Sequence, residues 1–243
     1  MAWFKTWFNT PYYHILYKNR DFTEAEAFIS LLVKDLQLSE GSEIIDLACG
    51  KGRHSIYLNQ LGFKVLGLDL SEESIAHNQQ FENDTLKFEV HDMRDEIEGS
   101  HVDAVFNLFT SFGYFDDQKD DERVFLSVNN ILKSNGYFVL DFLNEKYVRN
   151  TLVEETFVER PNITFKINKR IEGQHVIKDI RFSDGGEDFH FFERVKLHTL
   201  DEIDQLASQC GFERVKLYGN YKLEGFDLET SPRCINIFKK IEK

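Results

Sequence analysis

Residues 44–55 read IIDLACGKGRHS, an apolar run that passes through small residues into a polar segment. The run at Glu43–Ala48 has the pattern of a buried strand, and a helical pattern follows at about 53–61. Glycine at positions 50 and 52 permits tight turns and lets a ligand approach the backbone closely. The first amides of the following helix would face that ligand. By itself the stretch predicts a strand, a loop and a helix, and an ordinary turn of this kind is the alternative interpretation.

Strand-like and helix-like segments alternate along the chain up to residue 142. The strand-like runs lie at Glu43–Ala48, Lys64–Asp69, Leu86–His91, Val102–Leu108 and Gly136–Phe142. Helical patterns occupy about 21–37, 53–61, 71–80 and 119–133. Such alternation is typical of βαβ units, so we expect an α/β fold with a mainly parallel sheet and helices on both of its faces.

Consecutive strand-like runs follow after residue 150, at 162–171, 174–183 and 187–197, with glycines at the turns between them. We therefore expect residues 151–198 to form an antiparallel β meander, inserted after the fifth strand of one domain that spans residues 1–243. A helix at 199–210 and two more strands, near 213–221 and 233–240, would complete a seven-stranded sheet.

Charge and cysteine content restrict the partners that this chain can have. Its formal net charge of −13 repels phosphate backbones, so DNA is not an expected partner. A nucleotide cofactor is still compatible with that charge, because backbone amides and helix N-termini can hold one locally. The three cysteines form no Cys-x-x-Cys, which predicts neither a zinc site nor a disulfide framework and fits a reducing compartment.

The sequence contains no signal for a membrane. No run approaches the roughly 18 apolar residues of a transmembrane helix, and the first residues lack the apolar centre of a signal peptide. We expect a cytoplasmic protein that holds no metal. An aromatic stripe with helical spacing is expected to pack on the domain, and it consists of Trp3, Phe4, Trp7 and Phe8.

Polar residues also follow the second, third and fourth strands. Asp69 ends the second strand, where a carboxylate suits hydrogen bonds from ribose hydroxyls, although a helix cap near Ser71 is the alternative. Asp92 follows the third strand and would accept a hydrogen bond from an adenine amino group, with Met93 packed on the ring. Because ligands of open α/β sheets bind at the carboxyl ends of the strands, residues 104–114 would line the mouth of the same site.

Together these segments resemble the class I S-adenosylmethionine (SAM)-dependent methyltransferases. They are most similar to the small-molecule branch that contains glycine N-methyltransferase and the amino-sugar N,N-dimethyltransferases. The shared features are a D-x-A-C-G-x-G loop, a D-M-R after the third strand and a small and aromatic fourth motif, which here are residues 46–52, 92–94 and 104–114. The resemblance implies a Rossmann-like fold, SAM as methyl donor, S-adenosylhomocysteine as product, and a small-molecule nitrogen or oxygen as acceptor.

The resemblance also implies which residues bind the cofactor. In chain order they are Tyr13, Tyr17, Arg20, Asp46, Ala48, Cys49, Gly50, Gly52, Asp69, Leu70, Asp92, Met93 and Leu108. The loop at 46–52 would lie under the methionine part of SAM, and Asp69 would hold the ribose. Asp92 and Met93 would flank the adenine, and Arg20 would pair with the SAM carboxylate.

The sequence identifies no catalytic residue. An amine or hydroxyl acceptor has to lose a proton, and the candidates for a base are Tyr114, His190 and His198, residue types that are more often structural. The β insertion would cover the acceptor side, and its basic residues are Arg160, Lys166, Lys169, Arg170, Lys178, Arg181, Arg194 and Lys196. These permit an anionic acceptor, although a solvated outer face of a sheet is the commoner reason for such a pattern. An exposed edge of the insertion would also allow a homodimer.

Three other functions stay open at this point. A NAD(P)-dependent oxidoreductase would have a third glycine where Ser55 stands, and the Tyr-x-x-x-Lys at Tyr218 and Lys222 falls in a strand-like segment. An RNA methyltransferase usually carries Asn/Asp-Pro-Pro-Tyr to grip a flipped base, whereas residues 107–110 read NLFT. The third is a non-catalytic SAM-binding subunit, which no feature of the sequence favours or contradicts.

Overall fold

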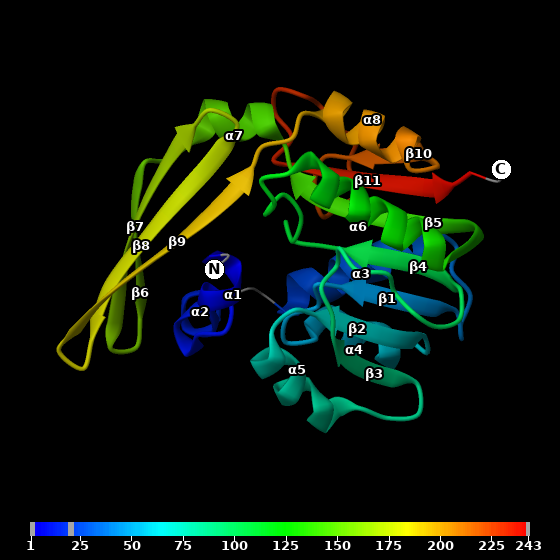
Figure 1. Ribbon diagram of the computed structural model, residues 1–243, viewed down its shortest axis with the longest axis horizontal. Coiled ribbons are helices and arrows are strands. Elements are labelled where there is room, and N and C mark those ends of the chain that lie inside the picture. Colours follow the sequence, from blue (N-terminus) through cyan, green and yellow to red (C-terminus); the bar gives the residue numbers. More distant parts are fainter. Residues whose placement is uncertain (1–2, 19–21, 242–243) are drawn as a thin grey trace.

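The computed structural model describes residues 3–18 and 22–241, and a seven-stranded sheet forms its body (Figure 1). The strand order is β10-β11-β5-β4-β1-β2-β3. The strands are β1 (Glu43–Leu47), β2 (Lys64–Asp69), β3 (Leu86–Val90), β4 (Val102–Asn107), β5 (Leu132–Leu143), β10 (Phe212–Tyr218) and β11 (Arg233–Lys240). Strand β11 is antiparallel to both of its neighbours, and the other pairs are parallel. The expected mostly parallel sheet of seven strands is confirmed.

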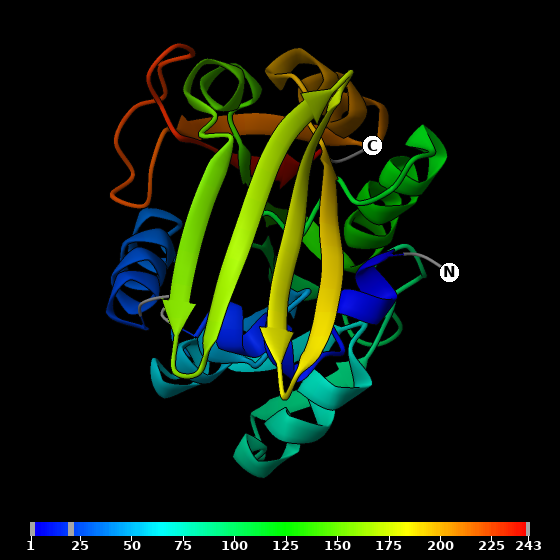
Figure 2. The same cartoon turned by 90° about the vertical axis from the view of Figure 1, so that its left-hand side faces the viewer.

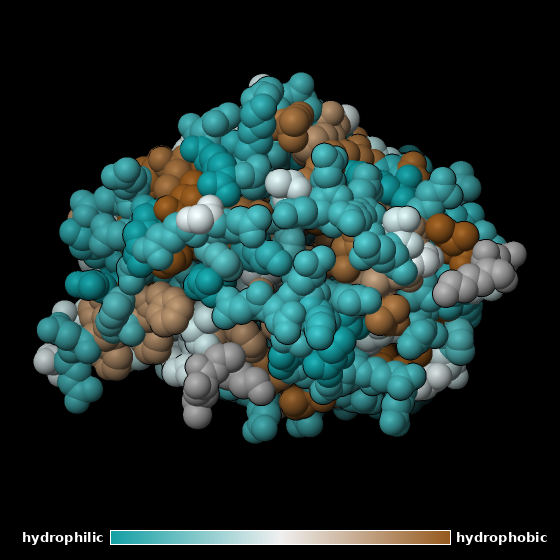
Figure 3. All heavy atoms as spheres, turned by 45° about the horizontal axis from the view of Figure 1, so that its top comes forward, coloured by the Kyte–Doolittle hydropathy of each residue, from teal (hydrophilic) through white to brown (hydrophobic). Residues whose placement is uncertain are grey.

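Helices cover both faces of this sheet. They are α3 (Phe22–Asp35), α4 (Arg53–Gln60), α5 (Glu72–Asn78), a short 3-10 turn η1 (Gln79–Phe81), α6 (Gln118–Ile131), α7 (Glu145–Thr151) and α8 (Leu200–Gln209). One core joins alternate sheet residues to α6 and α8, and a second core joins the opposite face to α3, α4 and α5. This arrangement follows from parallel strands, because their apolar residues on both faces must be covered. The surface over α6 and α8 is mainly hydrophilic (Figure 3).

A second, four-stranded sheet lies between β5 and α8 in the chain. Its antiparallel strands are β6 (Glu155–Arg160), β7 (Ile163–Glu172), β8 (His175–Asp184) and β9 (Glu187–Lys196), in that spatial order. The sequence pattern predicted the last three of these strands but neither β6 nor α7. Strand β6 alternates only between exposed and half-exposed residues, and α7 buries no side chain, so both carry weak signals.

Two short N-terminal helices, α1 (Trp3–Trp7) and α2 (Pro11–Leu16), lie between the two sheets (Figures 1 and 2). The Thr10 side chain accepts a hydrogen bond from the Tyr13 amide and caps α2, and Pro11 occupies the first turn. A third core joins Trp7 and Leu16 to the four-stranded sheet. Phe4 packs instead in the core of the main sheet, so the aromatic stripe bridges the two sheets.

Candidate functional site

The loop after β1 has an unusual backbone that its neighbours hold in place. Ala48, Gly50 and Gly52 all have positive φ angles, of 62°, 54° and 71°. At Gly52 a Cβ atom would meet the Phe88 ring at 2.9 Å, so glycine is needed there for space as well as for conformation. Below the loop, Asp46 accepts a hydrogen bond from the Ser55 hydroxyl at 2.6 Å. The loop is therefore a shaped surface rather than a flexible connection.

Asp69, at the end of β2, binds the same loop. Its Oδ2 accepts a hydrogen bond from the Gly50 amide at 2.7 Å, and its Oδ1 accepts one from the Ser71 amide at 2.8 Å. Burial raises the pKa of this carboxyl group, while the two amides oppose the rise. A carboxylate has about four lone-pair sites, so two acceptor positions remain for hydroxyl donors. This is the capacity that a ribose would use.

The end of β3 brings Asp92 and Met93 to the same edge of the sheet. The Asp92 carboxylate is bidentate to Arg94, with contacts of 2.9 Å to Nε and 2.6 Å to Nη2. The Arg94 guanidinium in turn lies over the Phe115 ring, 4.7 Å from its centroid. The sequence pattern did not predict this ion pair, which fixes the carboxylate that was expected beside the adenine.

These strand ends surround a cavity of about 600 Å³. We call it the first cavity. The expected cofactor residues that line it are Tyr13, Tyr17, Ala48, Cys49, Gly50, Asp69, Leu70, Asp92, Met93 and Leu108. Asp46 and Gly52 do not line it, because Asp46 is buried behind the loop and Gly52 caps α4. Arg20 lies outside the described residues.

Basic residues that the sequence pattern did not select also line the first cavity. Lys18 and Lys51 are exposed at its rim, with Arg53 and His14 beside them. The Arg53 guanidinium lies 4.5 Å from the centroid of the Phe109 ring. Burial and the Lys51 charge lower the pKa of His14 to about 4, so its ring is neutral at pH 7. Lys51 lies inside the glycine loop motif and Arg53 follows it as the first residue of α4, so their position in the sequence was a signal that could have identified them.

The loop after β4 is strained and is held by one buried carboxylate. Phe109 and Thr110 have φ angles of 58° and 63°, a region that costs a non-glycine residue on the order of 1 kcal/mol or more. Asp141 accepts a hydrogen bond from the Phe109 amide at 2.7 Å and also binds the Arg233 guanidinium at 2.8 Å and the Tyr221 hydroxyl at 3.2 Å. Asp141 is fully buried, so this network fixes the loop firmly.

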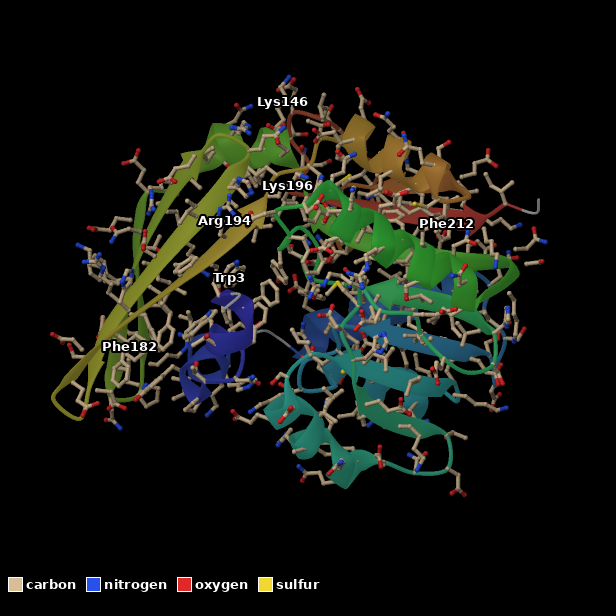
Figure 4. All side chains as sticks on the ribbon, in the orientation of Figure 1. Trp3, Lys146, Phe182, Arg194, Lys196 and Phe212 are labelled. Atoms are coloured by element: carbon tan, nitrogen blue, oxygen red, sulfur yellow. The ribbon has the colours of Figure 1, made fainter. Side chains whose placement is uncertain are left out.

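A second cavity, of about 460 Å³, lies on the other side of this strained loop. The α7 segment, the four-stranded sheet and the start of β11 form its other walls. The two cavities share one set of aromatic lining residues, which are Phe8, Tyr13, Tyr17, Phe109 and Tyr114. Figure 4 shows Trp3, another lining residue of the second cavity, between the two sheets.

Glu193 of β9 fastens the N-terminal helices to the four-stranded sheet. Its carboxylate accepts hydrogen bonds from Trp7 Nε1 at 2.9 Å and from the Tyr17 hydroxyl at 2.6 Å, and Lys178 Nζ lies 3.2 Å away. Burial alone would raise the pKa of Glu193, but the Lys178 charge and these hydrogen bonds outweigh it and lower the pKa. Glu193 therefore stays ionised and saturated with donors.

The three candidate bases occupy different places. Tyr114 lies in the wall that the cavities share, and its hydroxyl donates to the Thr110 carbonyl at 2.6 Å. His190 lies outside both cavities, in a hydrogen bond with Asp179 at the surface. His198 is buried beside Asp121 and is also absent from both linings. Of the three, only Tyr114 lies at the site.

Most basic residues of the insertion serve other contacts. Arg160 donates to the last carbonyls of α2, and surface ion pairs engage Lys166, Arg170 and Arg194. Figure 4 shows Arg194 and Lys196 near the end of β9 that adjoins the main sheet. Lys169 and Lys178 line the second cavity, so only these two of the expected basic residues have the required position.

Residues 3–18 and 22–241 lack two further features. No helix there is long and apolar enough to cross a membrane. No group of histidine, cysteine and acidic side chains there has the arrangement of a metal site. Tyr218 and Lys222, the pair that a dehydrogenase would use, line neither cavity.

Comparison with known proteins identifies the family of this chain. The family model described as "Methyltransferase domain" matches residues 38–201. YqeM of Bacillus subtilis, which carries the name of a methyltransferase, is 29% identical over 220 residues, covering 86% of this chain and 87% of that protein. Glycine/sarcosine N-methyltransferase of Aphanothece halophytica is 25% identical over 232 residues, covering 91% of this chain and 83% of that protein.

A solved structure has the same fold along almost the whole chain. The crystal structure of an S-adenosylmethionine-dependent methyltransferase from Clostridium acetobutylicum has a TM-score of 0.80 at 19% identity, with 95% of this chain and 96% of that chain covered. The expected Rossmann-like fold is thereby confirmed. The chain belongs to the methyltransferase domain family and has the fold of SAM-dependent methyltransferases.

Proposed function

We propose that this chain transfers a methyl group from SAM, bound in the first cavity, to a nitrogen or oxygen atom of a small molecule bound in the second. The observation that carries the proposal is the shared wall of aromatic residues between the two cavities. A donor in one cavity and an acceptor in the other would meet where these shared residues lie, without entering bulk water. Their volumes, about 600 and 460 Å³, are typical of small-molecule sites.

The residues of the first cavity fit SAM. The glycine loop offers an open surface, since a Cβ atom at Gly50 would meet nothing within 4 Å. Asp69 keeps free acceptor positions for ribose hydroxyls, and Met93 offers an apolar surface for the adenine. Lys51 and Lys18 at the rim supply positive charge for the methionine carboxylate. Arg20 remains a candidate for that role from the sequence alone.

The protein would orient the two substrates and exclude water from the reacting atoms. When bound, SAM supplies an electrophilic methyl group on its sulfonium. The aromatic residues shared by the two cavities would exclude water from the reacting atoms, and the strained loop fixes the place where donor and acceptor meet. A bond forms from the acceptor atom to the methyl carbon as the sulfur–methyl bond breaks, and its electron pair stays on sulfur. The acceptor proton leaves to solvent, and Tyr114 is the candidate to relay it.

The similarity to a relative named glycine/sarcosine N-methyltransferase supports an amine as the acceptor. An amine is also the simplest nucleophile for a site with few titratable groups, because its free-base form needs no further activation. Hydroxyl acceptors would require a stronger base than the described residues of the shared wall provide.

Calorimetric titration with S-adenosylhomocysteine, with NAD as the control ligand, tests the cofactor assignment. We expect one site for S-adenosylhomocysteine and no binding of NAD. The same protein is then assayed for conversion of SAM to S-adenosylhomocysteine in the presence of small amines. Tighter binding of NAD than of S-adenosylhomocysteine would contradict the proposal and favour an oxidoreductase. S-adenosylhomocysteine binding without turnover of any acceptor would favour the non-catalytic subunit.

A further inference from the structure

One row of charged residues crosses the mainly apolar inner face of the four-stranded sheet. We define the inner face as the side that packs on α1 and α2 (Figure 2). Most of its other residues are apolar, and they include Phe165, Ile167, Ile180, Phe182, Phe189, Phe191 and Val195. Arg160 and Asp184 also contact α2 on this face, but neither lines a cavity. In the strand register Lys169 pairs with Lys178, and Lys178 pairs with Glu193. All three side chains line the second cavity.

The charges of the second cavity do not balance. Its charged lining residues are Lys169, Lys178, Glu193 and Arg233. Glu193 neutralises Lys178 at 3.2 Å, and Asp141 neutralises Arg233 at 2.7 Å. Within residues 3–18 and 22–241 no carboxylate forms an ion pair with Lys169. The Lys169 ammonium is therefore not neutralised, although the formal net charge of the chain is −13.

The surroundings of Lys169 make this excess charge unfavourable in the free protein. Burial and the neighbouring Lys178 charge lower the pKa of Lys169, and Glu193 offsets only part of that effect. A charged group that is partly removed from water needs a counter-ion, or it destabilises the fold. Apolar residues fill the equivalent positions of the same strand, so the sheet does not need a lysine there. A ligand would supply the missing negative charge.

We infer that the second cavity binds an acceptor that carries a carboxylate, and that Lys169 binds this carboxylate. This inference rests on the proposed function and narrows its acceptor to small amines with one negative charge. A single uncompensated cation matches a monoanion better than a phosphate, which carries nearly two charges at pH 7. Tyr147, Thr151 and Tyr221 provide further polar groups on the opposite wall. With the carboxylate held at the sheet, the amine end would extend toward the shared aromatic wall.

The test compares matched acceptors and matched variants. The acceptors are glycine and β-alanine, their carboxamides, and phosphoethanolamine beside ethanolamine, and S-adenosylhomocysteine formation is the signal. The variants are Lys169→Met, the conservative Lys169→Arg, and Lys166→Met as the control. Lys166 lies on the same strand but pairs with Glu155 on the outside. Both methionine variants therefore lose one charge from β7.

We expect carboxylates to be methylated in preference to their carboxamides. Lys169→Met should raise KM for the carboxylates about 10- to 100-fold with little change in kcat, as the loss of a charged hydrogen bond does. Lys169→Arg should retain most activity, and Lys166→Met should behave as wild type. The melting temperature of Lys169→Met should equal or exceed that of wild type, because an uncompensated charge is removed.

Several outcomes would overturn the inference. The first two are equal methylation of carboxylates and their carboxamides, and methylation of phosphoethanolamine alone. The third is protein that binds S-adenosylhomocysteine but methylates no carboxylate. The fourth is identical kinetics for Lys169→Met and Lys166→Met. Failure of wild-type protein to bind S-adenosylhomocysteine is a different result. It would remove the proposed function itself, and the calorimetric titration detects it before any acceptor is added.

Discussion

The carboxylate of Asp69 accepts a hydrogen bond from the Gly50 amide over 2.7 Å, which ties the end of β2 to the loop that follows β1. Asp69 ends β2, and Gly50 follows the neighbouring parallel strand β1, so their contact depends on the strand register and not on sequence proximity. One group thus shapes the glycine loop and also presents free lone pairs to the first cavity. A substitution of Asp69 should therefore disturb both the geometry of the glycine loop and the binding of a ligand.

Asp69→Asn should weaken S-adenosylhomocysteine binding by about 10- to 100-fold. The side-chain NH2 of asparagine would face one of the two backbone N–H groups that now donate to the carboxylate, so two donors would meet. The substitution would also remove a hydrogen-bond acceptor from the expected ribose position. Calorimetry gives the dissociation constant. Asp84→Asn, in an exposed turn, is the matched control and should bind as wild type does. Equal affinities in the two variants would show that Asp69 does not contact the ligand.

Gly52→Ala should destabilise the protein more than Gly41→Ala. Both positions have positive φ angles, so each substitution carries the same kind of backbone strain, on the order of 1 kcal/mol. At Gly41 the new Cβ meets nothing within 4 Å, whereas at Gly52 it meets the Phe88 ring at 2.9 Å. Urea unfolding should show an additional loss of about 1–3 kcal/mol for Gly52→Ala. Similar losses for both variants would mean that Phe88 moves aside freely.

The main sheet and the first cavity were largely predictable because their signals are local. Most of the parallel strands contain a short apolar run, and polar residues such as Asp69 and Asp92 stand at the end of a strand or just beyond it. Parallel strands present their carboxyl ends at one edge of the sheet, so local patterns sufficed to bring these residues together. The Asp92–Arg94 ion pair was not predicted, because a side-chain pairing within a turn leaves no periodic pattern.

The second cavity was harder to predict because it depends on the pairing of distant segments. Lys169, Lys178 and Glu193 meet through the register of two hairpins, and Glu193 reaches Trp7 from the other end of the chain. A signal was nevertheless present. Alternate residues of β7 are apolar at Ile163, Phe165 and Ile167, and Lys169 continues that alternation as a charged residue on the buried side.

Glu193→Gln should lower the free energy of unfolding by about 3 kcal/mol. Removing one partner of a mostly buried ion pair leaves Lys178 without a counter-charge and weakens the attachment of Trp7 and Tyr17. Urea unfolding measures the loss. The exposed Glu187→Gln on the same strand is the control and should change little. The double variant Glu193→Gln/Lys178→Met should recover part of the loss, and a double variant less stable than Glu193→Gln would contradict this account.

Asp46→Asn should become more stable relative to wild type as the pH rises. Burial raises the pKa of Asp46 to about 6, so the folded protein holds this proton at a pH where the unfolded chain has released it. The folded state binds more protons between about pH 4 and pH 6, so wild-type stability falls as the pH rises through that window. A pKa shift of this size corresponds to about 3 kcal/mol at most. Asparagine does not titrate and can still accept the Ser55 hydrogen bond. The measurement is the change in melting temperature from pH 4 to pH 7. This change should be more favourable in Asp46→Asn than in wild type. An equal change in both proteins would mean that Asp46 has the same pKa in the folded and unfolded states.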